Sequence, residues 1–88
     1  MSNNLGSMNW REAKIACKKL GLGWRLPIKE ELNMLYENKE EIGGFANNDY
    51  WSSSEFDNFN AWVQNFYNGV QTSDIKNGDN YVRAVRSS

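Results

Sequence analysis

The sequence contains no histidine, one cysteine and one proline. A single cysteine, Cys17, excludes an internal disulfide, and without histidine it leaves too few ligands for a zinc site. No nucleophile motif is present, and Cys17 falls on an apolar helical stripe where its thiol would be inert. We therefore expect no enzymatic activity, no catalytic or metal-binding residues and no cofactor.

An excess of one charge and a long hydrophobic run are also missing. The 10 basic and 11 acidic side chains give a formal net charge of −1 at pH 7. Nucleic-acid binding depends on clustered Lys and Arg that displace counterions, so we expect no nucleic-acid partner. No apolar run approaches the roughly 20 residues that cross a bilayer, so we expect no direct membrane insertion. The N-terminal MSNNLGS lacks the basic and apolar regions of a signal peptide, and the compartment stays open.

The sequence does contain enough apolar material for one core. Its 88 residues are 40% hydrophobic and 14% aromatic, with four Trp, and this composition separates it from disordered chains. A chain of this length holds one domain. We assign residues 9–88 to that domain and expect residues 1–8 to be a disordered or truncated segment.

A first helix is predicted shortly after the N-terminus. Asn9 and Glu12 have the spacing of a capping box, in which each side chain accepts a backbone N–H of the other residue. Apolar residues then recur every three or four positions from Trp10 to Leu20, which indicates one buried helical face. Gly21 is expected to end this helix.

A second helix is predicted after the stiff connector Trp24–Pro27, because proline restricts the residue before it to an extended conformation. An apolar stripe through residues 32–36 indicates its buried face. The helix is expected to stop at Asn38 or at the glycine pair 43–44, after a short extra turn through residues 40–42.

The second half of the chain favours strands. Beyond Phe45, helix formers thin out and Asn, Ser, Gly, aromatic and β-branched residues take over. Asn68 and Gly69 both tolerate positive φ and predict a hairpin turn. The predicted strands are 50–55, 61–68, 70–75 and 81–86. The fold class is then α+β, with two helices packed on a small, twisted, mostly antiparallel sheet with long loops.

Six phrases in a fixed order carry a family resemblance. They are W-R-E-A-x-x-x-C-x-x-L at 10–20, G-W-R-L-P-x-K-E-E-L at 23–32, Y-W-S-S-S-E at 50–55, A-W at 61–62, N-G at 68–69 and Y-V-R-A-V-R at 81–86. Together they resemble the bacterial domain family of the Legionella collagen-like adhesin C-terminus and the Fibrobacter major paralogous domain. The resemblance implies a C-type-lectin-like fold and an adhesin context.

The family pattern implies further structural expectations. It often has Thr where Ile28 stands, so the second helix here lacks a side-chain cap. The strand that usually precedes the first helix is missing from our prediction, which would leave a sheet edge unpaired. Arg25, Arg83 and Arg86 lie in these phrases and fit recognition of an anion, but the family pattern implies that some of them make internal ion pairs with Glu31 or Glu55. We therefore expect structural roles for Arg25 and Arg83.

The Asn-rich segment from Phe56 to Asn80 resembles a second group of proteins. These are the variable regions of target proteins that diversity-generating retroelements mutate in bacteria and phages. There, adenine-directed mutagenesis acts on Asn codons. Undiversified members of the first family have Asn-rich loops as well, so a diversified and a fixed surface both fit this segment.

Alternation along the strand at 61–68 predicts which of its side chains are buried. Trp62, Gln64 and Phe66 fall on one side, which we assign to the core together with the other three Trp. The opposite side, which we expect to face solvent, carries Val63, Asn65 and Tyr67.

The loop before that strand contains two more rings, Phe56 and Phe59. They fit a binding surface, and they also fit a small satellite core under the loop. A calcium site is a second possibility for this region, because it contains four carboxylates: Glu55, Asp57, Asp74 and Asp79. Their spacing matches neither an EF-hand loop nor the phrases of calcium-dependent lectins, so we interpret them as solvated loop carboxylates.

From these patterns we predict a non-enzymatic module that recognises a protein or carbohydrate ligand. Rigid aromatic rings among adaptable amides are the chemistry of antibody loops. The predicted ligand-binding residues are Phe56, Asp57, Asn58, Phe59, Asn60, Val63, Asn65, Tyr67, Asn68, Gln71, Thr72, Ser73, Asp74, Ile75, Asn77, Asp79 and Asn80.

The alternative prediction is a structural or assembly domain, in which the same surface contacts another copy or a neighbouring domain. A homo-oligomer would then form. In either case we expect the chain to belong to a longer protein at the bacterial cell surface, secreted, or on a phage particle.

Overall fold

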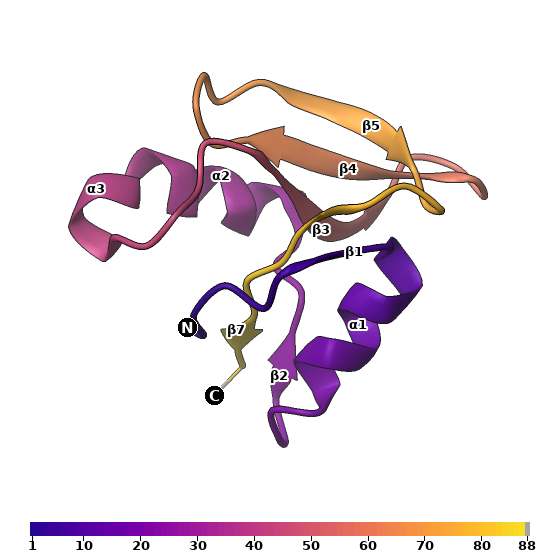
Figure 1. The fold of residues 1–88 in the computed structure, drawn as a ribbon, viewed down its shortest axis with the longest axis horizontal. Helices are drawn as coiled ribbons and strands as arrows, with labels where there is room; N and C mark the ends of the chain where they lie inside the picture. The colour runs from indigo at the N-terminus through magenta and orange to yellow at the C-terminus, as the bar shows by residue number, and fades with distance from the viewer. Residues whose placement is uncertain (88) are drawn as a thin grey trace.

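Residues 1–87 are described in a computed structural model, which has an α+β fold (Figure 1). The helices are α1 (Trp10–Lys18), α2 (Lys29–Glu37) and α3 (Lys39–Ile42). The strands are β1 (Ser7–Met8), β2 (Trp24–Arg25), β3 (Asp49–Glu55), β4 (Asn60–Asn65), β5 (Gln71–Ile75), β6 (Asn80–Tyr81) and β7 (Val85–Arg86). The predicted α+β class is therefore confirmed.

Five of the strands form one sheet in the order β1-β6-β3-β4-β5, and β2 pairs with β7 in a separate sheet of two strands. Every pair is antiparallel except β3 with β6. Three predicted strands correspond to β3, β4 and β5. The fourth, predicted at 81–86, is interrupted, because the chain leaves the large sheet after Tyr81 and then pairs Val85 with Arg25 of β2.

Both faces of the large sheet are covered. Neighbouring side chains of a strand point to opposite faces, and the neighbours Tyr50 and Trp51 of β3 lie in different core clusters. Trp51 belongs to a cluster with Ala13 and Cys17 of α1. Tyr50 belongs to a second cluster with Leu32 of α2. The core is therefore two layers, one on each side of β3 and β4.

Burial of Val63 corrects the sequence prediction. The predicted alternation of β4 is present, but Val63 is only 1% exposed and lies in the α1-side cluster with Trp51. The prediction assumed that the second face of the sheet was open to solvent, as in many antiparallel sheets. Here α1 covers that face, so Val63 is a core residue and is removed from the predicted binding surface.

The predicted tryptophan core is confirmed in part. Trp10 and Trp51 are buried, as is Phe66. Each buried indole N–H donates to a backbone carbonyl, Trp10 to Ser52 and Trp51 to Met8. Trp24 and Trp62 are only half-buried.

Residues 1–8 are ordered along the sheet, so the expectation of disorder there is wrong. Ser7 of β1 pairs with Tyr81 of β6, and the N–H of Leu5 donates to the carbonyl of Val82 at 2.9 Å. Leu5 also packs against the α1-side cluster. The strand before the first helix is thus present, and its two residues are too few to give a recognisable β pattern.

The first helix begins as predicted. The side chain of Asn9 accepts the N–H of Glu12 at 2.9 Å, and the carboxylate of Glu12 accepts the N–H of Asn9 at 3.2 Å. This reciprocal pair is a capping box. The helix ends at Lys18, three residues before Gly21.

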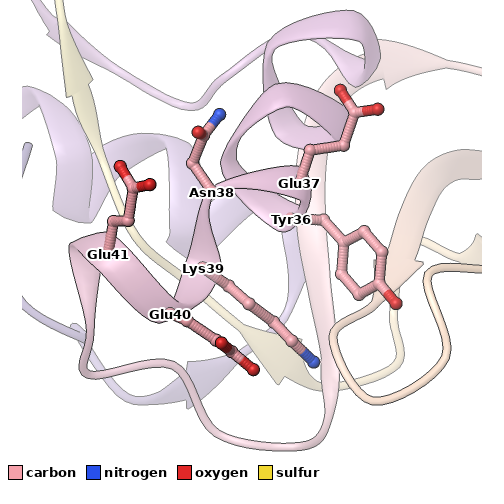
Figure 2. Close-up of a pocket in the computed structure, with 6 residues that line it drawn as sticks. All are labelled: Tyr36, Glu37, Asn38, Lys39, Glu40 and Glu41. Atoms are coloured by element: carbon pink, nitrogen blue, oxygen red, sulfur yellow. The ribbon is translucent and has the colours of Figure 1, made fainter.

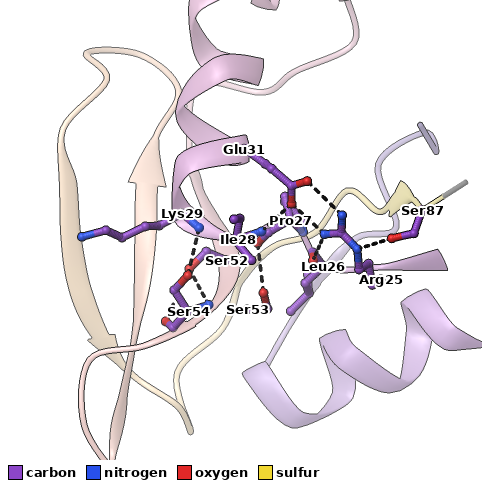
Figure 3. Close-up of polar contacts among 10 residues, drawn as sticks. All are labelled: Arg25, Leu26, Pro27, Ile28, Lys29, Glu31, Ser52, Ser53, Ser54 and Ser87. Atoms are coloured by element: carbon purple, nitrogen blue, oxygen red, sulfur yellow. Dashed lines mark hydrogen bonds and ion pairs between the residues drawn. The ribbon is translucent and has the colours of Figure 1, made fainter. Parts of the chain in front are cut away.

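The connector between β2 and α2 is held by a two-pronged ion pair (Figure 3). Arg25 donates from Nη1 to Oε1 of Glu31 at 2.6 Å and from Nη2 to Oε2 at 2.9 Å. These hydrogen bonds lower the pKa of Glu31 below its ordinary value. The implied ion pair of Arg25 is therefore confirmed. Arg83 instead donates to the carbonyls of Ser2 and Gly43, and no ion pair of Arg83 occurs within residues 1–87.

The start of α2 is capped from another element. Ile28 has no side-chain acceptor, but the hydroxyl of Ser54 in β3 accepts the N–H of Lys29 at 3.0 Å (Figure 3). Glu31 accepts the N–H of Ile28 at 2.9 Å. An irregularity in the β3–β4 pairing lies between Trp51 and Glu55 and includes this serine. The missing cap is thus supplied by the irregular part of β3.

We expect Ser54→Ala to lower the free energy of unfolding by about 1 kcal/mol, the usual value of a helix N-cap. Ser53→Ala is the matched control, because Ser53 donates its backbone N–H to the carbonyl of Pro27 at 2.8 Å, which alanine keeps, and loses only a long hydroxyl contact of 3.4 Å to the same carbonyl. Urea denaturation of both variants measures the difference. Equal loss in the two variants would show that the Ser54 hydroxyl does not act as the cap.

Candidate functional site

The predicted binding residues do not form one surface. Strand β4 runs between two groups of them and has six residues, so at about 3.3 Å per residue the groups lie roughly 20 Å apart. We call residues 56–60 and 75–79 the loop surface, and residues 66–70 the hairpin end. Figure 1 shows the β3–β4 loop and the β4–β5 turn at opposite ends of the β4–β5 hairpin.

The loop surface is built around the carboxylate of Asp57. Its Oδ1 accepts the backbone N–H of Phe59 and of Asn60, both at 2.8 Å, and the side-chain amide of Asn60 at 3.0 Å. These hydrogen bonds, that from Phe59 first, lower the pKa of Asp57 below its ordinary value. Asp57 is therefore the structural centre of the turn, in the way aspartate commonly folds a loop onto itself.

Lys76 ties this loop to the rest of the domain. Its ammonium donates to Oε2 of Glu55 at 2.9 Å and to the carbonyl of Asn58 at 3.0 Å. Its backbone N–H donates to the carbonyl of Phe59, and its carbonyl accepts the N–H of Trp10. The hydrogen bond from Lys76 lowers the pKa of Glu55. The loop surface is thus fixed at several points along its length.

Two aromatic rings and one aliphatic side chain are exposed on this fixed loop surface. Phe59 is 74% exposed and Phe56 is 55% exposed. Phe56 packs edge-on against Trp62, with ring centroids 5.4 Å apart. Ile75, which pairs with Asn60 across the strands, is also exposed. The sequence allowed these rings to be either a binding surface or a small satellite core. Phe59 fits the binding surface, whereas Phe56 is partly packed.

Two residues beside the loop surface were missed by the sequence prediction. The ammonium of Lys29, at the start of α2, lies 4.1 Å from the ring centroid of Trp62. Trp62 is half-buried and contacts both this cation and Phe56. The three side chains come from α2, β4 and the β3–β4 loop, and no local sequence pattern links them.

The hairpin end exposes a different ring. Tyr67 is 71% exposed, and its N–H is accepted by Oδ1 of Asn65 at 2.9 Å. Asn65 also bonds Asp49 through its side-chain amide, and the side chain of Asn68 accepts the N–H of Val70. These two asparagines shape the turn, so Tyr67 and the exposed Val70 are the apolar side chains of this end that are free to contact a partner.

Asn80 is a second correction to the predicted site. It is only 7% exposed, and its amide donates to Oδ2 of Asp74 at 2.8 Å. The reason is its position in β6, where it pairs with Met8 of β1. Gln71 is half-buried and donates to the carbonyl of Lys29, so it too has a structural contact.

The remaining predicted residues lie along or beside the loop surface with varied exposure. Asn58, Thr72, Asn77 and Asp79 are exposed, while Ser73 and Asp74 are half-buried.

The free edge of the large sheet is partly satisfied within the chain. The N–H of Lys76 donates to the carbonyl of Phe59, just before β4, and the carbonyl of Val70 accepts the N–H of Asn65 at the end of β4. The backbone groups of residues 71, 73 and 75 therefore face outward. At Ile75 the N–H is accepted by Asp74 and the carbonyl accepts the N–H of Gly78. Only a short part of β5 is therefore open to a further strand.

A hollow between α2 and α3 is less suited to binding (Figure 2). It has a volume of about 320 Å³ and is lined by residues 36–41. Lys39 lies over the ring of Tyr36 and donates to the carbonyl of Phe66. Figure 2 shows Glu37 and Glu41 pointing away from these two side chains. The groups diverge, so they do not form a common binding site.

Metal and thiol chemistry have little support in the described residues. Within residues 1–87 there is no cluster of three or more His, Cys, Asp or Glu side chains able to hold a metal ion. Burial raises the pKa of Cys17 to about 11, so its thiol is protonated at neutral pH. No helix of residues 1–87 has both the length and the apolar character needed to cross a bilayer.

Comparison with protein families places nearly the whole chain in one family. The family model described as the Lcl C-terminal domain matches residues 1–86, which include every helix and strand of the structure. Comparison with curated proteins gives no match. The chain therefore belongs to the Lcl C-terminal domain family, that of the Legionella collagen-like protein C-terminus, and is an adhesin-associated bacterial domain.

Proposed function

We propose that this domain is a non-enzymatic recognition module that binds a protein or glycan ligand through the loop surface. The observation that carries the proposal is Phe59, a ring that is 74% exposed on a loop held by hydrogen bonds from both of its sides. A large exposed ring on a fixed loop has no role in the core. Within a longer surface, secreted or phage-borne protein, it would supply the contact area.

The rigidity of the loop supports this proposal. A ligand that binds a flexible loop must offset the entropy of ordering it, whereas a loop already fixed by Asp57 and Lys76 avoids most of that cost. Aromatic rings beside amide side chains combine rigid contact area with adaptable hydrogen bonding. Asn58 and Asn77 supply exposed amides next to Phe59.

The proposed scaffold is a C-type-lectin-like fold, in which long loops on a small sheet carry the ligand site. Two features support it. The large sheet is covered by α1 and α2 on its two faces, and the candidate contact residues lie in connections between strands. The site is therefore on loops positioned by a packed framework, as binding sites commonly are.

The hydrogen bonds of the Asn-rich segment favour a fixed surface over a diversified one. The side chains of Asn60, Asn65, Asn68 and Asn80 each bond to a neighbouring turn or strand. Replacing any of them would remove a turn or cap contact. We propose that asparagine is frequent here because it stabilises turns, which leaves Asn58 and Asn77 as the exposed amides.

Phe59→Ala tests the proposed function, and Tyr67→Ala is its matched control. The two rings are exposed to a similar extent at opposite ends of β4. Binding of the wild-type domain to a printed panel of defined glycans and purified extracellular-matrix proteins gives the reference. We expect Phe59→Ala to weaken the strongest interaction about tenfold or more, as loss of an aromatic anchor does, and Tyr67→Ala to leave it nearly unchanged.

The same variants separate recognition from assembly. Sedimentation velocity at micromolar concentration reports the oligomeric state of the wild-type domain. If the wild type is a dimer that Phe59→Ala converts to a monomer, the loop surface serves self-association and the recognition proposal fails. A wild-type monomer whose panel binding depends on Phe59 supports recognition.

A further inference from the structure

The edge strand of the large sheet, β5, has backbone groups that no neighbouring strand pairs. Alternate residues of an antiparallel strand bond to opposite sides, and residues 70 and 76 bond toward β4. Gln71 and Ser73 therefore present their backbone N–H and C=O groups outward. Within residues 1–87, no loop or side chain bonds to these outward groups. The open part of β5 thus offers these residues to a further strand.

The α2 side of this edge carries an apolar and cationic strip. Ser73 lies directly opposite Trp62 of β4, and paired residues point to the same face. The ammonium of Lys29 lies 4.1 Å from the ring centroid of Trp62, and Figure 3 shows this side chain extending from the start of α2 toward the β4–β5 hairpin. Ile75, 52% exposed, follows on the same face of β5. Because serine is small, a side chain on an added strand can cross Ser73 and reach Trp62.

These features indicate an extended peptide as the ligand. The N–H and C=O groups of an antiparallel strand match the spacing of Gln71 and Ser73, with a pair of backbone hydrogen bonds at each residue. Within residues 1–87, Lys29 makes no ion pair, so an acidic side chain on that strand gains a partner. A second copy pairing through its own β5 would bring its Lys29 to the same face, where like charges repel.

We propose that β5 binds an extended peptide segment of a partner protein, which adds to the large sheet as a strand antiparallel to β5. An apolar side chain of the peptide lies over Ser73 against Trp62. An acidic side chain two positions further along the peptide, opposite Gln71, pairs with Lys29. The inference goes beyond the proposed function, because Gln71 and Ser73 lie outside the loop surface.

The test is an NMR titration of the isotopically labelled domain with the end-capped peptide T-V-T-L-T-E-T. In the proposed register its leucine lies opposite Ser73 and its glutamate opposite Gln71. We expect saturable shifts at the backbone amides of Gln71 and Ser73. The dissociation constant should be on the order of millimolar, because a few hydrogen bonds must offset the entropy of ordering the peptide.

Two N-methylated peptides separate strand pairing from side-chain contact. N-methylation of the leucine removes the N–H that pairs with Ser73 and should weaken binding about tenfold or more. N-methylation of the threonine that follows it is the matched control. The N–H of that threonine points away from β5, so the dissociation constant should change less than about twofold. An equal loss with both peptides would contradict strand addition.

Lys29→Gln tests the acidic position. It should weaken binding of the glutamate peptide about threefold, as expected for an exposed ion pair, and leave a peptide with glutamine at that position nearly unchanged. Lys19→Gln, which removes the same charge from an exposed site on another element, is the control and should have little effect. The same loss for both peptides would show that Lys29 does not pair with the acid.

Two further outcomes would overturn the inference. One is the absence of saturable peptide binding. The other is a peptide-free dimer, seen by sedimentation velocity, that Ser73→Pro converts to a monomer. Proline there removes only an outward N–H, so this result would assign the edge to a second copy. Peptide binding should persist in Phe59→Ala, since Phe59 lies outside β5, and failure of the panel experiment and of this titration are therefore separate outcomes.

Discussion

Val63→Asp is expected to unfold the domain. Val63 is 1% exposed and packs in the cluster that joins β4 to α1. A charged carboxylate there has no partner, and an uncompensated buried charge costs about 3–5 kcal/mol. Small domains are stable by only about 5–15 kcal/mol in total, toward the low end at this size. Loss of the folded circular-dichroism signal, or a steep drop in the urea midpoint, measures the effect.

Thr72→Asp is the matched control for that substitution. Thr72 is directly opposite Val63 in the β4–β5 register and is exposed. The two substitutions introduce the same side chain at neighbouring points of one sheet face. We expect Thr72→Asp to change the free energy of unfolding by no more than about 0.5 kcal/mol. A Val63→Asp variant as stable as Thr72→Asp would mean that the packing of α1 does not bury the β4 part of this face.

The contrast between α1 and β4 shows which features sequence alone can predict. The capping box of Asn9 and Glu12 involves residues three positions apart, so its geometry follows from the local spacing. The alternation of β4 is local as well, and it was predicted correctly. Whether the second face of β4 is covered depends on where α1 packs, which is a long-range contact. The prediction therefore placed the Val63 side chain on the correct face of the strand but took that face to be open to solvent.

In the candidate site, too, local features were predicted and long-range contacts were not. The exposed rings of Phe59 and Tyr67 were predicted from their polar surroundings, and both are exposed. The two rings are far apart because strand β4 lies between them. The sequence prediction placed both rings on one surface and did not take the length of this strand into account. Lys14 contacts Trp10 from one turn along α1, a local spacing, whereas Lys76 reaches the same ring from a segment far away in the sequence. No spacing rule relates Lys76 to Trp10, so this contact was not predicted.

The Asn-rich segment is a case in which composition alone was ambiguous. An asparagine that contacts a ligand and an asparagine that stabilises a turn look identical in the sequence. The hydrogen bonds distinguish them, because Asn65 and Asn80 donate or accept within the fold while Asn58 remains exposed. A residue type that serves both purposes can be assigned only when its partners are known.

Gly69→Ala is expected to lower the free energy of unfolding by about 2–4 kcal/mol. Gly69 has φ +80°, a conformation that alanine adopts at a cost, and an added Cβ would lie 2.5 Å from Cε2 of Tyr36. The Tyr36 ring is not free to move away, because it packs edge-on against the buried Phe66 with centroids 5.7 Å apart. Overpacking at such a contact typically adds 1–3 kcal/mol to the backbone strain.

Gly44→Ala separates the two causes in the Gly69 prediction. Gly44 has the same φ of +80°, but an added Cβ there would come no closer than 3.5 Å to another atom, Nη1 of Arg83, which is an ordinary contact. Its substitution should cost only the backbone strain, about 1 kcal/mol. The difference between the two midpoints in urea denaturation then measures the contact with Tyr36, which ties the β4–β5 turn to α2. Equal losses would mean that the turn and the helix are not in contact. That outcome would also contradict the burial of Gln64. Its side-chain amide is fully buried because it donates both to Asn33 of α2 and to the carbonyl of Gly69 in the turn, which requires the helix and the turn to lie together.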